Sequence, residues 1–170
     1  MFYRLIVCSV LLLSIPAYAE DLISNLPPDP GAAGKTTLEG IDSDNDGVRD
    51  DVQRWIVLTY PNSEKTRAAL IQMAKAMQTI LLNATDVVNA RTYSLEADRA
   101  SDCISYIQRQ LGISGGDTYN LKREMEAVYL NTYVRSKAWL QHDAHLSGMS
   151  FSVPADLSSG CDFDPAAMQN

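Results

Sequence analysis

The sequence predicts an all-α protein: a compact bundle of about four helices that follows an extended leader and an acidic loop. Apolar residues recur at helical spacing from residue 48 to residue 140, and no segment alternates with period two for long enough to form a strand. The apolar pattern is interrupted at Pro61, Gly112 and Gly148. Because the connections between the runs are short, successive helices should be antiparallel neighbours in a bundle.

The first two helices are expected on either side of Pro61. The first contains Val48, Val52, Trp55, Ile56 and Thr59 at helical spacing, and Pro61 stops it. The second should start near Asn62 or Ser63, because either side chain can cap a helix. Its predicted buried stripe is Leu70, Met73, Ala74, Met77, Ile80, Leu81 and Ala84.

The last two helices are expected on either side of a turn at Ser114, Gly115 and Gly116. For the third helix, Thr85 or Asp86 is the candidate cap and Gly112 the end, with Tyr93, Ala97, Ala100, Ile104, Ile107 and Leu111 on one side. For the fourth, Asp117 or Thr118 is the candidate cap and Gly148 the end. Its predicted inner face is Leu121, Met125, Val128, Tyr129, Thr132, Trp139 and Leu140.

Residues 1–19 have the pattern of a secretory signal peptide. Arg4 precedes an apolar run, Pro16 breaks that run, and Ala17-Tyr18-Ala19 has the form of a cleavage site. The alternative is an uncleaved membrane anchor, but the apolar run is shorter than the ~20 residues of a spanning helix. The mature chain is therefore expected to start at Glu20, to be secreted or periplasmic, and to have no membrane segment.

The net charge of -7 argues against two classes of partner. Nucleic-acid binders need a basic footprint, and anionic membrane surfaces also attract basic faces. The negative charge fits the binding of a cation, and it equally fits a protein that is only highly soluble.

Prolines and glycines set the limits of the helical domain. The leader, residues 20–39, contains Pro27, Pro28, Pro30, Gly31 and Gly34 and should be extended. The helical domain with its loop then covers residues 40–148. The tail, residues 149–170, contains Pro154 and Pro165 and should be irregular.

Two cysteines, Cys103 and Cys161, remain after the signal peptide and its Cys8 are removed. An exported protein meets an oxidising environment, and two cysteines allow only one intramolecular pair. A disulfide between them would tether the tail. Two free thiols, or one bridge to another chain, are the alternatives.

An acidic loop, Asp42 to Gln53, carries the chemistry of the chain. Its acids fall at loop positions 1, 3 and 5, with glycine at position 6, and this is the ligand plan of a calcium loop. The predicted ligands are Asp42, Asp44, Asp46, the backbone carbonyl of Val48, Asp50 directly or through water, and Gln53. The alternative is a solvated acidic turn in which the charges of Asp50 and Asp51 stabilise a helix N-terminus. The sequence leaves open whether Asp51 also binds the ion.

The loop resembles the EF-hand-like calcium loops of the thrombospondin type 3 and dockerin kind, D-x-D-x-D-G-x-x-D, over about twelve residues. The resemblance implies a calcium ion as cofactor. The loop departs from a full EF-hand at three points: no helix precedes it, Gln53 replaces an acid, and Arg49 occupies a usually apolar position. It should therefore be an isolated loop rather than a paired sensor.

The expected function is a secreted or periplasmic calcium-binding protein with a structural ion and a helical body that binds or scaffolds. There are two alternatives. One is an exported enzyme with a pocket that the sequence does not reveal, and the other is a dockerin-like assembly module with a protein partner. His142 and His145 could share a zinc face, but two ligands are too few, and surface histidines at a helix C-terminus are expected. No catalytic residue is predicted.

Overall fold

The computed structural model describes Leu22 and residues 24–170. The predicted signal peptide, residues 1–19, lies outside this part of the chain. Within it the protein forms five α-helices and no strand, which confirms the all-α prediction. None of the helices described is long and apolar enough to cross a membrane.

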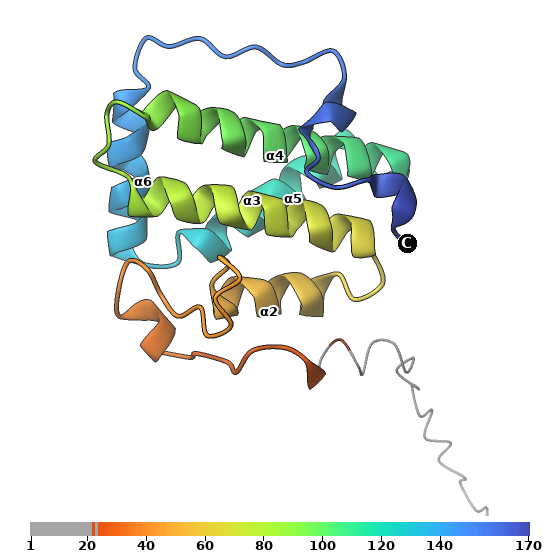
Figure 1. Cartoon of the computed structure of the whole chain (residues 1–170), viewed down its shortest axis with the longest axis horizontal. Helices are drawn as coiled ribbons and strands as arrows, with labels where there is room; N and C mark the ends of the chain where they lie inside the picture. The colour runs from red at the N-terminus through yellow and green to blue at the C-terminus, as the bar shows by residue number, and fades with distance from the viewer. Residues whose placement is uncertain (1–21, 23) are drawn as a thin grey trace, which may run out of the picture.

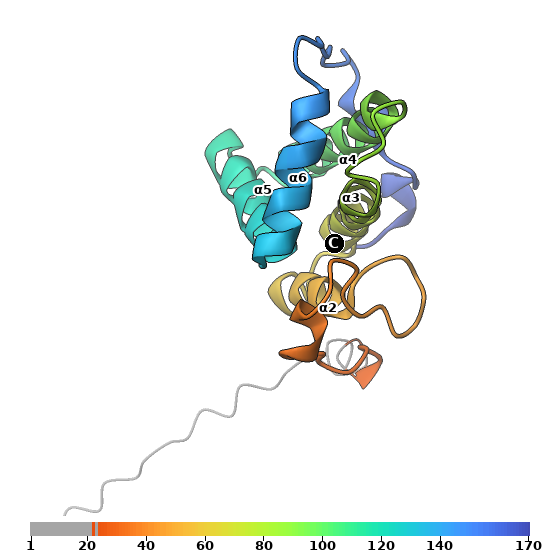
Figure 2. The same cartoon turned by 90° about the vertical axis from the view of Figure 1, so that its left-hand side faces the viewer.

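The helices are α2 (Asp50–Thr59), α3 (Glu64–Leu82), α4 (Ala90–Gln110), α5 (Gly115–Tyr129) and α6 (Tyr133–His145). Helices α3 and α4 lie side by side in the middle of the molecule, α2 lies beneath α3, and α6 stands across one end (Figure 1). Turned by 90°, the molecule shows α5 and α6 together on one side of α3 and α4 (Figure 2).

The prediction of about four helices is wrong by one, because the chain between Asp117 and Gly148 forms two helices. Helix α5 ends at Tyr129, and Thr132 caps α6 by accepting a hydrogen bond from the amide of Arg135 at 3.3 Å. Short polar side chains offer the backbone local bonds that compete with the helix. The cap at Thr132 therefore starts a new helix where apolar periodicity alone would continue the old one.

The predicted caps are correct for α3 and displaced for two other helices. Ser63 accepts a hydrogen bond from the amide of Thr66, as a helix cap does. Helix α4 begins only after Asn89, because Asp86 instead folds the preceding turn by accepting bonds from the amides of Val88 and Asn89. Ser114 rather than Asp117 caps α5.

The core lies between α2, α3, α4 and α5. Its buried members include Val52, Ile56, Leu70, Met77, Ile80, Ile104, Ile107, Leu121, Met125 and Tyr129. The inner face of α6 differs from the prediction: Leu140 is 65% exposed, whereas Arg135, Ala138 and His142 are buried. Two polar residues thus occupy positions that hydrophobic periodicity would give to apolar ones.

The cross-link and the tail agree with the sequence. Cys103 and Cys161 form a disulfide with Cα atoms 4.8 Å apart, which confirms the predicted pair. The tail contains only the short 3₁₀ turns Leu157–Gly160 and Pro165–Ala167, and the leader contains one at Ala33–Lys35. Gln72 of α3 holds the tail from the other side, since its amide donates to the carbonyl of Gly160 and accepts from the amide of Asp162.

His142 is buried, with 1% of its surface exposed, so its predicted place on the surface is wrong. Its Nε2 lies 2.9 Å from the hydroxyl of Ser94 on α4, and its Nδ1 is buried without a partner among the described residues. Burial, and next the nearby His145, lower the pKa of His142, while Asp143 opposes the shift. The imidazole is therefore neutral in the folded protein near pH 7.

We expect this burial to make the protein less stable in mild acid. A depressed pKa in the folded state means that stability is complete above the ordinary value of 6.5 and is lost as the pH falls from there toward the lower folded pKa. Urea unfolding at pH 7.5 and 5.5 should show a fall in wild type that is smaller in His142→Gln. His145→Gln is the control, and an equal fall in wild type and His142→Gln would contradict the expectation.

Candidate functional site

The acidic loop connects the leader to α2 and is closed by its own side chains. The amide of Asp50 donates to the carbonyl of Ile41 at the base of the loop. The carboxylate of Asp42 accepts hydrogen bonds from the amides of Asp46 (3.2 Å) and Gly47 (3.0 Å). Gly47 has φ +88°, in the left-handed region that favours glycine, so a side chain there would strain the turn.

Three of the predicted ligand side chains lie together. Asp42, Asp44 and Asp50 each offer a carboxylate oxygen, and these oxygens lie within 4.8 Å of one another. Because calcium–oxygen distances are about 2.3–2.6 Å, ligands on opposite sides of one ion are roughly 5 Å apart. The three oxygens are therefore close enough to contact a single ion.

Asp46 lies outside this group. Its carboxylate accepts a hydrogen bond from the amide of Val48 at 2.8 Å, which folds the turn locally. Burial raises the pKa of Asp46, the bond from Val48 opposes the shift, and the charges of Asp44 and Asp42 raise the pKa further. Val48 itself is 1% exposed and packs its side chain into the core, so the loop is anchored where α2 begins.

Gln53, the last predicted ligand, reaches the acidic group from the first turns of α2. Its Nε2 donates to the carboxylate of Asp44 at 3.3 Å. Its Oε1 is buried and has no hydrogen-bond partner among the described residues. A buried amide oxygen without a partner is costly, and a cation is one partner that would satisfy it.

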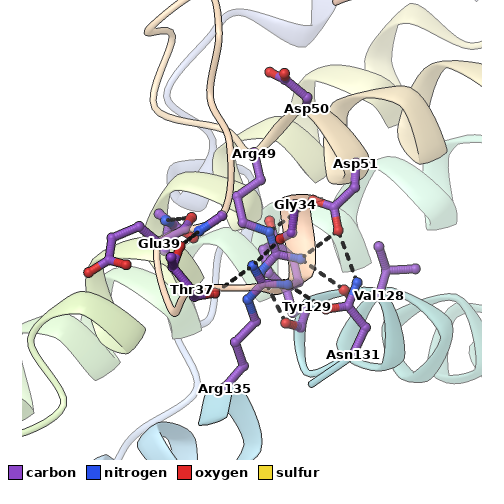
Figure 3. Close-up of polar contacts among 12 residues, drawn as sticks. Gly34, Thr37, Glu39, Arg49, Asp50, Asp51, Val128, Tyr129, Asn131 and Arg135 are labelled. Atoms are coloured by element: carbon purple, nitrogen blue, oxygen red, sulfur yellow. Dashed lines mark hydrogen bonds and ion pairs between the residues drawn. The ribbon is translucent and has the colours of Figure 1, made fainter. Parts of the chain in front are cut away.

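Asp51 does not join the group, although the sequence left this open. Its carboxylate accepts a two-pronged pair from Arg49 at 2.9 and 3.1 Å and a third bond from Asn131 (Figure 3). Burial alone would raise the pKa of Asp51, but the bonds and charge of Arg49 lower it overall. Asp50 and Asp51, adjacent in the sequence, thus point to different sites.

Two buried arginines next to the loop form a junction that the sequence did not reveal. Arg49 is 1% exposed and also donates to the carbonyls of Val128 and Tyr129 at the end of α5. Arg135 is 0% exposed and donates to the leader carbonyls of Gly34, Thr37 and Leu38 (Figure 3). The two guanidinium groups thereby connect three segments: the acidic loop, the leader, and the α5–α6 break, which is the short connection between the end of α5 at Tyr129 and the start of α6 at Tyr133.

Gly40 allows the two arginines to lie this close to the leader. Its φ is +74°, and an added Cβ would lie 2.6 Å from Cδ of Arg49 and 2.8 Å from Nη2 of Arg135. Any side chain would displace both. The glycine before the acidic loop is therefore required for the junction and not only for the turn.

No protein-family model matches the chain, and neither a curated protein nor a solved structure matches it.

Proposed function

We propose that the mature chain is a secreted or periplasmic calcium-binding protein, with one structural ion in the loop from Asp42 to Gln53. The observation that carries the proposal is the group formed by Asp42, Asp44 and Asp50, with the side chain of Gln53 bonded to Asp44. The donors are oxygens only, which is the set that calcium prefers. The disulfide is compatible with an oxidising compartment outside the cytoplasm.

The proposed role of the ion is structural, because the loop is joined to the rest of the fold on both sides. Asp50 supplies a proposed ligand from the first residue of α2, while the adjacent Arg49 and Asp51 bind the α5–α6 break. An ion that holds the loop would also hold this junction in place. The helical body would then serve as a binding or scaffold module.

A dockerin-like assembly role is less favoured by the position of Arg49. Partner contact through Arg49 would require an accessible side chain, but its guanidinium is buried and bonded to Asp51, Val128 and Tyr129. We therefore take the ion and the helical body as the proposed functional parts.

Calcium should raise the stability of the mature protein. The neutral Gln53 suggests a modest dissociation constant, roughly 10⁻⁴ to 10⁻³ M. At 100 times that constant, an ion that binds only the folded state adds about 2.7 kcal/mol. For a chain of this size the gain corresponds to a rise of about 5–10 °C in melting temperature. Magnesium should do little, because it demands a tighter octahedral shell.

The measurement combines thermal melts and calorimetry in calcium, in magnesium and in chelator. Asp44→Asn is the sharpest variant, because Asp44 is exposed and its removal disturbs the fold least. Asp143→Asn removes an exposed acid on α6 and is the matched control. If wild type shows no calorimetric binding at millimolar calcium and no change in melting temperature, the loop is only an acidic turn and the proposal is wrong.

A further inference from the structure

An apolar cavity of about 220 Å³ lies among α3, α4, α5 and α6, and none of its lining residues belongs to the acidic loop. Its apolar lining is Met73, Met77, Ile104, Met125 and Trp139. An apolar cavity of about 150 Å³ is large enough to hold benzene. Methionine side chains are flexible and polarizable, so a wall with three of them can adapt to a range of apolar shapes.

One cationic group, Lys122 of α5, lines this cavity. Its Nζ donates to the hydroxyls of Ser101 (2.7 Å) and Ser105 (2.8 Å) on α4. In the part of the chain that the structure describes, Lys122 forms no ion pair. An ammonium group carries three donors, so one donor remains beyond the two bonds to the neutral serines.

A second polar group at the cavity also lacks a partner. Tyr129 lines the cavity, and its hydroxyl is buried with no hydrogen-bond partner among the described residues. Cζ of Arg49 lies over the Tyr129 ring at 5.7 Å from its centroid. A buried hydroxyl with no partner costs free energy that a bound polar atom would recover.

We propose that this cavity binds a small amphiphile with an apolar chain and a carboxylate head. The chain lies among the methionines and Trp139, and the head pairs with the ammonium group of Lys122. Glu126 also lines the cavity, and Asp102 acts electrostatically on Lys122. These acids repel an anion, so recognition of the head depends on Lys122.

Binding fits this cavity better than catalysis by a serine–lysine pair. Ser101, the serine closest to Lys122, lies in the interior of α4. Interior helical amides already bond to the carbonyl four residues earlier, so none of them is available to stabilise an oxyanion beside Ser101. The lysine is therefore assigned to hold the head of a ligand, and Ser101 and Ser105 position it.

The test uses octanoate as the probe and Trp139 as the reporter. The chain has two tryptophans, so Trp55→Phe leaves Trp139 as the sole tryptophan, which is excited selectively at wavelengths that tyrosine does not absorb. Titration of octanoate should change the Trp139 emission in a saturable way, both in calcium and in chelator, because no residue of the loop lines the cavity. Octylammonium, with the same chain and the opposite charge, should bind at least about tenfold more weakly.

Three variants in the same background decide the assignment. Lys122→Gln should weaken octanoate about tenfold or more while leaving octanol unchanged, because a hydrogen bond to a charged group is lost. Lys137→Gln removes an exposed lysine of α6 and should change nothing. Met73→Trp fills the cavity, and in this variant calorimetry should find no octanoate binding. Absence of saturable octanoate binding to a folded Trp55→Phe protein, or equal octanoate affinity in the Lys122→Gln and Lys137→Gln proteins, would overturn the proposal.

Discussion

Replacing Arg135 by alanine should lower the free energy of unfolding by about 3–5 kcal/mol, because several buried hydrogen bonds to a charged group, each worth about 1.5–3 kcal/mol, are lost at once. The guanidinium group is fully buried and bonds to three leader carbonyls and to the side chain of Asn131. Without it, the carbonyls of Gly34, Thr37 and Leu38 lose their partner, and each buried group left unpaired costs about 1–3 kcal/mol unless water reaches it.

Urea unfolding measures the global loss, and limited proteolysis reports on the leader. In Arg135→Ala, cleavage between residues 27 and 39 should become fast under conditions in which the wild-type leader resists. Arg135→Lys keeps the charge but loses the planar fork that reaches several carbonyls, so it should recover only part of the stability. Arg123→Ala removes an exposed arginine and is the control. A stable Arg135→Ala protein with a protected leader would show that the junction contributes little.

Sequence reasoning predicted the helices well where a helix start or stop is encoded locally. Pro61 follows α2, and Ser63 caps α3 through a bond that depends on neighbouring residues alone. The disulfide was also predictable, because exclusion of Cys8 left a single pair. In these cases the deciding interaction lies within a few residues or follows from a count, so no tertiary structure is needed.

The α5–α6 region shows where periodicity fails. The buried positions of α6 are Arg135, Ala138 and His142, and they have helical spacing but not apolar chemistry. Arg135 is buried because leader carbonyls about one hundred residues away accept its bonds. Hydrophobic spacing cannot identify a polar residue whose partners are so distant in the sequence, and so Leu140 was assigned to the wrong face.

The loop shows an intermediate case. Spacing predicted that the acids of the loop converge, but only some of them do. The carboxylates of Asp42, Asp44 and Asp50 lie together, although Asp42 and Asp50 also accept bonds from backbone amides. Asp51 instead bonds to the buried Arg49, a tertiary partner that spacing does not reveal.

Removal of the disulfide should lower the free energy of unfolding by about 4 kcal/mol. The link joins residues 58 positions apart, and the chain-entropy account assigns roughly this value to a loop of that length, with the mechanism dependent on the model used. The tail also bonds to Gln72, forms an ion pair between Asp162 and Arg99, and has its last two residues bonded to Ser63 and Glu64. In the double variant Cys103→Ala and Cys161→Ala, the tail should detach before the helices unfold.

Two comparisons separate loss of the link from loss of packing. Cys103 is fully buried, so its replacement by alanine also leaves a small cavity. Reduced wild type keeps the volume of both cysteine side chains and loses only the disulfide bond. Reduced wild type should therefore show most of the expected loss in urea. Gln72→Leu, with the disulfide intact, removes both hydrogen bonds to the tail and should cost less than the missing link. If reduced and oxidised wild type unfold at the same urea concentration, the disulfide contributes no stability. The hydrogen bonds from Gln72 of α3, together with the close contact of Gly160 with α4, would then be enough to hold the tail.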